Sequence, residues 1–386
     1  IDHLERRLRG LGAEVDRWTA RMRELEADPA YPGREVERDE VPVVAARLPG
    51  RRPGPEVLLT GHVDVVPPGD PERWTADPFE PRIAGGRLVG RGAADMKAGL
   101  TAALEVFERF ARRRDFPGAL WLLAVPGEED GGTGTLSAIR RGVRADAVLI
   151  PEPTAAQDDV PRVVVAHGGA VTYKVSCAGR AAHAAFRLEG SSALDAFLVV
   201  HRALLEAEAR LNDAERDELL RELGLPYPTS VGAIAGGQWA STVMDHLEAE
   251  VRVGAALGET FEDVDRRVQA DLQAAARAAG GFLAEHPPVA TRFGGAYRAA
   301  RTPSDHPLVE AVRASAAEVY GSPAHLAAMP YGCDMGQWRH LTGAPVVVYG
   351  PGRARVAHVA DEWVELDAVS RAADVLERTV DRVLST

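Results

Sequence analysis

The sequence predicts an α/β protein whose main sheet is mixed, mostly parallel and flanked by helices. Short, almost continuous apolar runs alternate with helix-length segments in which apolar residues recur every three or four positions. A region of different character, 168–288, interrupts this pattern and predicts an inserted α+β domain of two layers. We therefore expect a main domain made of residues 1–167 and 289–386, with the inserted domain between its two parts.

Four apolar runs are expected to form the centre of the main sheet. Each is apolar at nearly every position, which is typical of a strand covered on both faces. They are 56–60 (EVLLT), 119–125 (ALWLLAV), 147–150 (AVLI) and 344–349 (APVVVY). Between the first two, the apolar spacing of 96–113 predicts a helix, and Asp95 stands where its N-cap would be.

The inserted region has the pattern of strand, helix, strand and helix. The expected elements are an alternating strand at 170–179, a long charged helical stretch around 193–221, a strand at the edge of the sheet at 246–254, and a helix at 261–279. The Pro-rich stretch 223–230 (LGLPYPTS) is expected to be a loop.

Composition and charge exclude several classes of partner. A chain of 386 residues that is 46% hydrophobic can bury a large core, and its length suggests two domains. The net charge of −12 argues against nucleic acid and anionic membranes, because both would repel such a surface, so a small-molecule partner fits better. Cys177 and Cys333 are too few for a disulfide framework.

No signal peptide or long apolar span is visible, which predicts a cytoplasmic protein. The chain begins at Ile1, inside an amphipathic helical pattern and without an initiator Met. This expectation therefore applies to the sequence as given, because a removed targeting segment could have preceded it.

Acidic and imidazole groups follow the carboxyl ends of the expected strands. In chain order they are His62, the pair Glu128 and Glu129, Glu152, and His358, with Asp95 added from a helix start. Parallel neighbouring strands would bring these groups together at one edge of the sheet, where α/β proteins bind ligands. Two histidines and several carboxylates, without a thiol, suit Zn and also Mn or Co.

Each of these residues also has an ordinary structural interpretation. Taken alone, Asp95 is more simply an N-cap, and Glu152 lies between two prolines, as a turn residue would. The run from Glu128 to Asp130 resembles a solvated acidic loop, and lone histidines are mostly structural. Their joint placement favours a metal site, because carboxylates gathered at one sheet edge repel one another unless a cation or raised pKa values relieve them.

Six sequence blocks carry a more specific signal. They are GHVDVVP, GRGAADMKAG, PGEEDGGTGT, PEPT, GRAAHAA and YGPGRARVAH. In order and spacing they resemble the acetylornithine deacetylase, succinyl-diaminopimelate desuccinylase and aminoacylase family of dinuclear zinc metallohydrolases. Six ordered blocks spread over most of the chain are far more specific than a single H-x-D motif.

The resemblance implies two divalent metal ions, most simply Zn, with Co or Mn as alternatives. It implies that Asp95 bridges them, that His62 and Glu152 complete one site, and that Glu129 and His358 complete the other. A bridging carboxylate is what a paired-metal site needs. Asp64 resembles the residue that orients the imidazole of the first histidine ligand.

The resemblance also implies the reaction. Glu128 matches the general base, which would take a proton from water so that a metal-bridging hydroxide attacks the amide carbonyl of an N-acyl amino acid. His183 resembles the residue that stabilises the oxyanion across a homodimer formed by the inserted lid domain, and Arg252 matches the arginine that binds a substrate carboxylate. Without the resemblance, His183 is better explained as a buried histidine at a strand end, and Arg252 equally well as a solvated charge.

Three segments depart from the family pattern. The lid segment Asn-x-Ile/Val-Pro is replaced by residues 241–244 (STVM), the acid of the D-x-R segment is Glu250, and a Ser/Thr-Asp pair is Cys333-Asp334. These changes leave the acyl group and the amino-acid side chain of the substrate open. Two alternatives also stay open: a di- or tripeptidase with the same site, and a non-catalytic member that binds metal or peptide.

Overall fold

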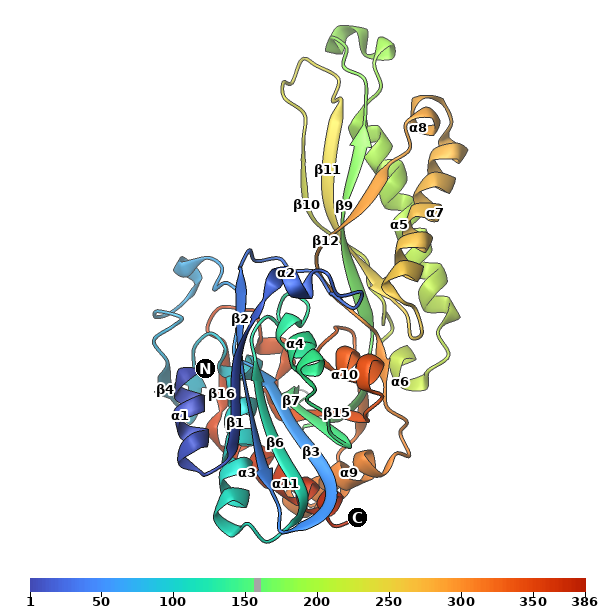
Figure 1. Cartoon of the computed structure of the whole chain (residues 1–386). Helices are drawn as coiled ribbons and strands as arrows, with labels where there is room; N and C mark the ends of the chain where they lie inside the picture. The colour runs from blue at the N-terminus through green and yellow to red at the C-terminus, as the bar shows by residue number, and fades with distance from the viewer. Residues whose placement is uncertain (156–160) are drawn as a thin grey trace.

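The computed structural model describes residues 1–155 and 161–386. Figure 1 shows two parts, a larger one built around a broad sheet and an elongated one in which helices lie along a narrow sheet. Both chain ends lie in the larger part. The predicted architecture, a helix-flanked main sheet with an inserted two-layer domain, is confirmed.

The main sheet has the strand order β1-β2-β6-β3-β7-β15-β8-β13, with β14 beside β8. Its strands are β1 (Glu14–Arg21), β2 (Glu40–Pro49), β3 (Arg52–His62), β6 (Pro117–Val125), β7 (Ala147–Ala155), β8 (Val163–His167), β13 (Ala300–Arg301), β14 (Leu326–Met329) and β15 (Val346–Arg353). The four strands predicted for the centre correspond to β6, β3, β7 and β15, which are consecutive neighbours and mutually parallel. Their carboxyl ends therefore meet at one edge, as the sequence predicted.

Helices cover both faces of this sheet. On one face lie α3 (Ala98–Arg113), α9 (Pro307–Tyr320) and α11 (Leu366–Leu384), and on the other α4 (Thr133–Arg141) and α10 (Met335–Thr342). Consecutive residues Leu58 and Leu59 of β3 are both fully buried, one in each of the two apolar clusters. Side chains alternate along a strand, so a run apolar at every position requires cover on both faces.

The start of α3 differs from the expected one. A kinked turn, Ala93–Lys97, whose backbone is not helical at Asp95 and Met96, precedes the helix, and Lys97 rather than Asp95 is the residue before its first turn. The side chain of Asp95 points toward two histidines instead, so its interpretation as an N-cap is wrong. Gly99 allows the helix to approach β7, because a Cβ there would lie 1.7 Å from the carbonyl oxygen of Pro151.

Shorter elements complete the larger part. They are α1 (Asp2–Gly10), α2 (Met22–Leu25), α6 (Glu218–Arg221) and a small sheet of β4 (Arg82–Ala84), β5 (Arg87–Val89) and β16 (Trp363–Glu365). Within the described ranges, no helix is both long enough and apolar enough to cross a membrane.

The inserted part is an antiparallel sheet in the order β10-β11-β9-β12. The strands are β9 (Gly169–Ala178), β10 (Ser230–Gly236), β11 (His246–Ala255) and β12 (Val289–Tyr297), packed against α5 (Ala193–Ala214) and α7 (Phe261–Ala279), with the short α8 (Gly281–Glu285) following α7. Figure 1 shows α5 and α7 along one side of this sheet.

The predicted edge position of 246–254 is wrong, because β11 lies between β10 and β9. Alternation shows that a strand has one buried face, but only the partner strands decide whether it is central. The missed partner β10 has the sequence SVGAIAG and is mostly exposed, so it lacks the apolar and polar alternation that marks a half-buried strand. The other edge strand, β12, begins at Val289, so the sheet uses residues beyond 288.

Candidate metal centre

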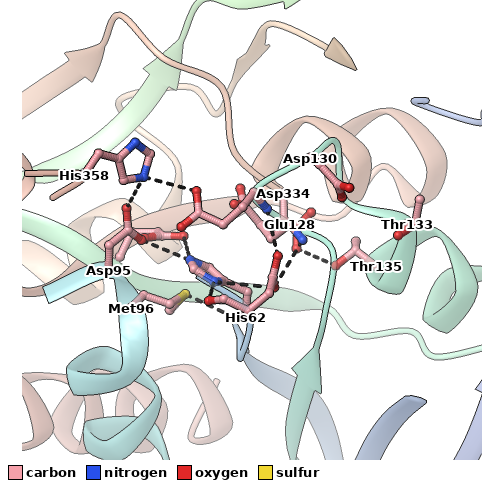
Figure 2. A network of polar contacts seen from close by, with 12 residues as sticks. His62, Asp95, Met96, Glu128, Asp130, Thr133, Thr135, Asp334 and His358 are labelled. Carbon is pink, nitrogen blue, oxygen red and sulfur yellow. Dashed lines mark hydrogen bonds and ion pairs between the residues drawn. The ribbon is translucent and has the colours of Figure 1, made fainter. Parts of the chain in front are cut away.

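The carboxyl ends of the central strands bring the predicted ligands together. His62 ends β3, Glu152 lies in β7, Glu128 and Glu129 are in the loop after β6, and His358 is in the loop after β15. Asp95 reaches the same place from the kinked turn before α3. Figure 2 shows Asp95 between His62 and His358.

Each carboxylate oxygen of Asp95 faces a different histidine. Its Oδ1 is 3.0 Å from His62 Nε2, and its Oδ2 is 3.3 Å from His358 Nε2. Each histidine has a second carboxylate nearby: Glu152 Oε1 lies 3.5 Å from His62 Nε2, and Glu129 Oε2 lies 3.1 Å from His358 Nε2. The result is two His-carboxylate groups that share one aspartate, which is the donor arrangement a pair of divalent ions requires.

The geometry also gives Glu128 a place among the donors. Ligand atoms of His62, Glu128 and Glu152 all lie within 4.8 Å of one another, as do those of His62, Asp95 and Glu129. Distances alone therefore allow Glu128 to be either a ligand or a base beside the ligands.

Burial and mutual repulsion shift the titration of these acids. Burial, together with the charge of Asp95, raises the pKa of Glu128 and Glu152 well above the usual range of a carboxyl. Burial would also raise the pKa of Asp95, but hydrogen bonds from His358 and His62 outweigh it and lower that pKa. The raised pKa values reflect the crowding of these carboxylates, which a bound cation would relieve.

The pKa values of the two histidines are raised as well. Burial would lower the pKa of His62, but the charges of Glu152 and Asp95 raise it well above its ordinary value. Hydrogen bonds to Asp95 and Glu129 raise the pKa of His358 to about 10. Both rings must lose these protons to bind an ion through Nε2, so metal binding weakens as the pH falls.

Asp64, the residue expected to orient the imidazole of His62, contacts that ring through its backbone and not through its carboxylate. His62 Nδ1–H donates to the backbone carbonyl of Asp64 at 3.0 Å, whereas Asp64 Oδ1 is 3.7 Å from that nitrogen, beyond hydrogen-bonding distance. This contact leaves Nε2 free as the ligand atom. The Asp64 carboxylate instead accepts the backbone N–H groups of Glu128 and Glu129, at 3.4 and 3.2 Å. Asp64 thus positions the acidic loop through its side chain and the histidine through its backbone.

Sequence reasoning missed two residues that position the cluster. The fully buried Glu362 accepts the N–H groups of Ala94 and Asp95, at 2.9 and 3.0 Å, and pairs with the buried Arg91 at 2.5 Å. Tyr297, at the end of β12, donates its O–H to the carbonyl of Glu128 at 2.8 Å. In the sequence, Glu362 stood out only as an acidic residue four positions after His358. No sequence signal marked Tyr297.

Arg252 reaches the metal cluster from the inserted domain. A cavity of about 270 Å³ is lined by Arg252, Tyr297, Cys333 and the carboxylates of the cluster. Burial lowers the pKa of the Arg252 guanidinium, and among the described residues no carboxylate pairs with it. The alternative of a solvated surface charge is therefore wrong. Cys333, at one of the positions that depart from the family pattern, lies in the wall of the same cavity.

His183 lies elsewhere in the inserted domain. Its side chain is exposed, its Nδ1 accepts the N–H of Ala185 at 3.1 Å, and it does not line the cavity of its own chain. Its backbone pairs with that of Thr242, so segment 241–244, which departs from the family pattern, lies beside it. The alternative of a buried strand-end histidine is wrong, since the ring is on the surface.

Comparison with known proteins agrees with this geometry. The sequence profile described as peptidase family M20/M25/M40 matches residues 58–382. A succinyl-diaminopimelate desuccinylase of Thioalkalivibrio sulfidiphilus is 31% identical over 335 residues, which cover 82% of this chain and 82% of that protein. An N-formyl-4-amino-5-aminomethyl-2-methylpyrimidine deformylase of Bacillus subtilis is 26% identical over 378 residues, 93% of this chain and 83% of that protein.

A solved structure shares the fold. A tripeptidase from Staphylococcus aureus superposes with a TM-score of 0.75 at 20% identity, covering 100% of this chain and 92% of that one. The match of the family profile includes every block that carries a residue of the metal cluster. The chain is a member of peptidase family M20/M25/M40.

Proposed function

We propose that this protein is a metal-dependent amidohydrolase that removes the acyl group of an N-acyl amino acid. The observation that carries the proposal is Asp95 placed between two histidines, each with its own carboxylate, in a cavity that also holds Glu128 and Arg252. The family membership and the desuccinylase and deformylase relatives, which act on acyl amides, support this reaction class.

His62, Asp95 and Glu152 would hold one ion, and Asp95, Glu129 and His358 the other. Two divalent ions, with Zn as the first choice and Co or Mn as alternatives, would polarise the amide carbonyl and lower the pKa of water. Asp64 and Glu362 keep the ligands in place through the backbone of the acidic loop and of Asp95.

Glu128 moves the proton in this proposal. Its carboxylate takes a proton from the attacking water and delivers it to the nitrogen of the departing amine, so no covalent intermediate forms. Two cations held by the neighbouring ligands would lower the raised pKa of Glu128, because positive charge nearby favours the ionised carboxylate. Arg252 binds the α-carboxylate of the amino acid, a task that suits a guanidinium without a carboxylate partner of its own.

A substrate screen tests this function. We expect the purified protein, stripped with a chelator and reloaded with Zn, Co or Mn, to release primary amine from N-acetyl or N-succinyl amino acids. The chelated protein should be inactive and regain activity on reloading. Faster release from dipeptides or tripeptides than from every N-acyl amino acid would replace the proposal by a peptidase function. Turnover of neither class in the fully loaded protein would favour a non-catalytic binding role.

We also propose that the protein works as a homodimer joined through the inserted domain. β10 is an edge strand that is exposed along most of its length, and an open edge of this kind needs cover. His183 is exposed and does not line the cavity of its own chain, so a role at the oxyanion requires a second subunit.

Both cysteines are free, which supports a cytoplasmic location.

Mixing two inactive variants tests the role of His183. His183→Ala and Glu128→Ala are each expected to be nearly inactive, and an exchanged mixture should recover about a quarter of wild-type activity. About half of the dimers are mixed, and each of these has one cleft with an intact base from its own chain and an intact histidine from its partner. If the subunits exchange and the mixture stays at background, His183 does not act across subunits.

A further inference from the structure

The acidic loop, residues 127–132, carries Glu128 and Glu129, yet its own backbone does not fix its position. It contains three glycines with positive φ angles, among them Gly127 at 77° and Gly131 at 119°. Glycine permits many backbone conformations, so such a loop keeps one position only where contacts from other segments impose it. The third acidic residue of the loop makes contacts of this kind.

Asp130 ties the acidic loop to residues 32–38, a segment between α2 and β2. Its side chain is only 7% exposed, and its Oδ1 accepts a hydrogen bond from Arg38 Nη2 at 2.6 Å. Its Oδ2 accepts the backbone N–H groups of Glu35 and Val36, each at 3.3 Å. Figure 2 shows this carboxylate away from the two histidines of the metal cluster. Asp130 therefore fastens the loop and is not a candidate ligand.

Segment 32–38 is itself held by both domains. The carbonyl of Pro32 accepts the N–H of Ala296, in strand β12 of the inserted domain, at 2.7 Å. In the main domain, Arg38 donates a second hydrogen bond from Nη2, to the hydroxyl of Thr133 at the start of α4, at 3.1 Å. An ion pair supported by further hydrogen bonds is strongly oriented, so the segment can hold the acidic loop from the side opposite the metal cluster.

We propose that Asp130 and Arg38 are positioning residues that hold Glu128 and Glu129 in their working places. This inference rests on the proposed function, because it takes Glu128 as the base and Glu129 as a ligand. Residues that orient metal ligands from behind change metal affinity or activity by about 10–100-fold when they are removed. A shift of about 1 Å at a reacting group costs about 100-fold in rate. The ion pair acts through the loop and touches neither ion nor substrate.

Asp130→Ala is expected to weaken one metal site selectively, which Zn titration against a chromophoric chelator measures. The ion at Glu129 and His358 should bind about 10–100-fold more weakly than in wild type. The ion at His62 and Glu152 should stay within about threefold of wild type, because neither of these ligands is in the acidic loop. In the loaded enzyme, kcat should fall by about 10–100-fold with KM near its wild-type value, since the loop carries the base and not Arg252.

Removing the other member of the ion pair should have the same selective effect. Arg38→Ala leaves the buried carboxylate of Asp130 without its charged partner, which favours a shift of the loop toward solvent. The double variant should be no worse than Asp130→Ala alone, because both changes break the same link. Arg301→Ala is the matched control, since Arg301 is 27% exposed, pairs with Asp217 at 2.5 Å and does not line the metal cavity. It should leave both metal affinities and kcat unchanged.

Unchanged metal affinities and kcat in Asp130→Ala would overturn this inference and leave the proposed function standing. Equal weakening of both ions would also overturn it, because it would indicate a general structural role. If Asp130→Ala does not fold, Asp130→Asn decides, since it keeps the size of the side chain and should show the same selective loss to a smaller extent. If no substrate is hydrolysed, the proposed function fails, and the metal titration alone decides: selective weakening supports the inference, and any other result contradicts it.

Discussion

Replacing Glu128 with alanine is expected to lower kcat by about 10²–10⁴-fold, the range that a general base contributes. Its carboxyl is buried against His62 and Glu152, in the cavity that also contains Arg252. If Glu128 is the base, the variant keeps two ions per chain and a near-normal KM, because only the proton transfer is lost. Steady-state kinetics together with elemental analysis measure both quantities.

The metal content of Glu128→Ala decides whether Glu128 is a ligand or a base, the two roles that the distances allow. Loss of an ion from Glu128→Ala would make Glu128 a ligand. Turnover above roughly a tenth of wild type would show that it is not the base. Glu128→Gln serves as the conservative companion, because it keeps the shape of the side chain and removes only its basicity. A comparable loss of kcat in this variant shows that the missing function is proton transfer and not packing.

Replacing Asp95 with alanine is expected to remove both ions and most of the activity. Its two oxygens face different histidines, at 3.0 and 3.3 Å, so each metal site loses a ligand at once. Glu128, Glu129 and Glu152 then face one another without the shared cation that relieves their repulsion. Elemental analysis after dialysis against metal-containing buffer should find well under one ion per chain, with a lower thermal midpoint.

A conservative variant and a neighbouring acid sharpen this test. Asp95→Asn keeps the size of the side chain, so its metal loss separates coordination from misfolding. Asp361→Asn is the matched control, since Asp361 lies three positions after His358 and binds Thr75 rather than the cluster. It should keep two ions per chain. Full metal content in Asp95→Asn and Asp95→Ala would contradict the bridging role.

The linear pattern of the chain determined the central sheet and the gathering of the candidate ligands at its edge. β6, β3, β7 and β15 were predictable because strands buried on both faces are apolar at nearly every position. The gathering of these side chains was predictable because parallel strands place the residues after their carboxyl ends at one edge. His62 and Glu152 need no more than this rule, since the strands that carry them are direct neighbours.

The inserted domain was predicted less completely for a physical reason. Alternation identified β9 and β11, whose buried faces hold the apolar cluster with α5 and α7. β10 exposes most of its residues, and β12 is interrupted by a bulge between Arg292 and Ala296, so neither has a clean period of two. The central position of β11 follows from these two partners and is not encoded in its own sequence.

Only the tertiary structure decided how the side chains of the site are aimed. Asp95 turns away from α3 because Glu362 binds its backbone N–H, and the two residues lie 267 positions apart in the chain. Asp64 contacts His62 through its carbonyl because its carboxylate is occupied by the loop of Glu128 and Glu129. A local pattern specifies residue type and spacing, whereas such orientations depend on hydrogen bonds between distant segments, which exist only once the chain has folded.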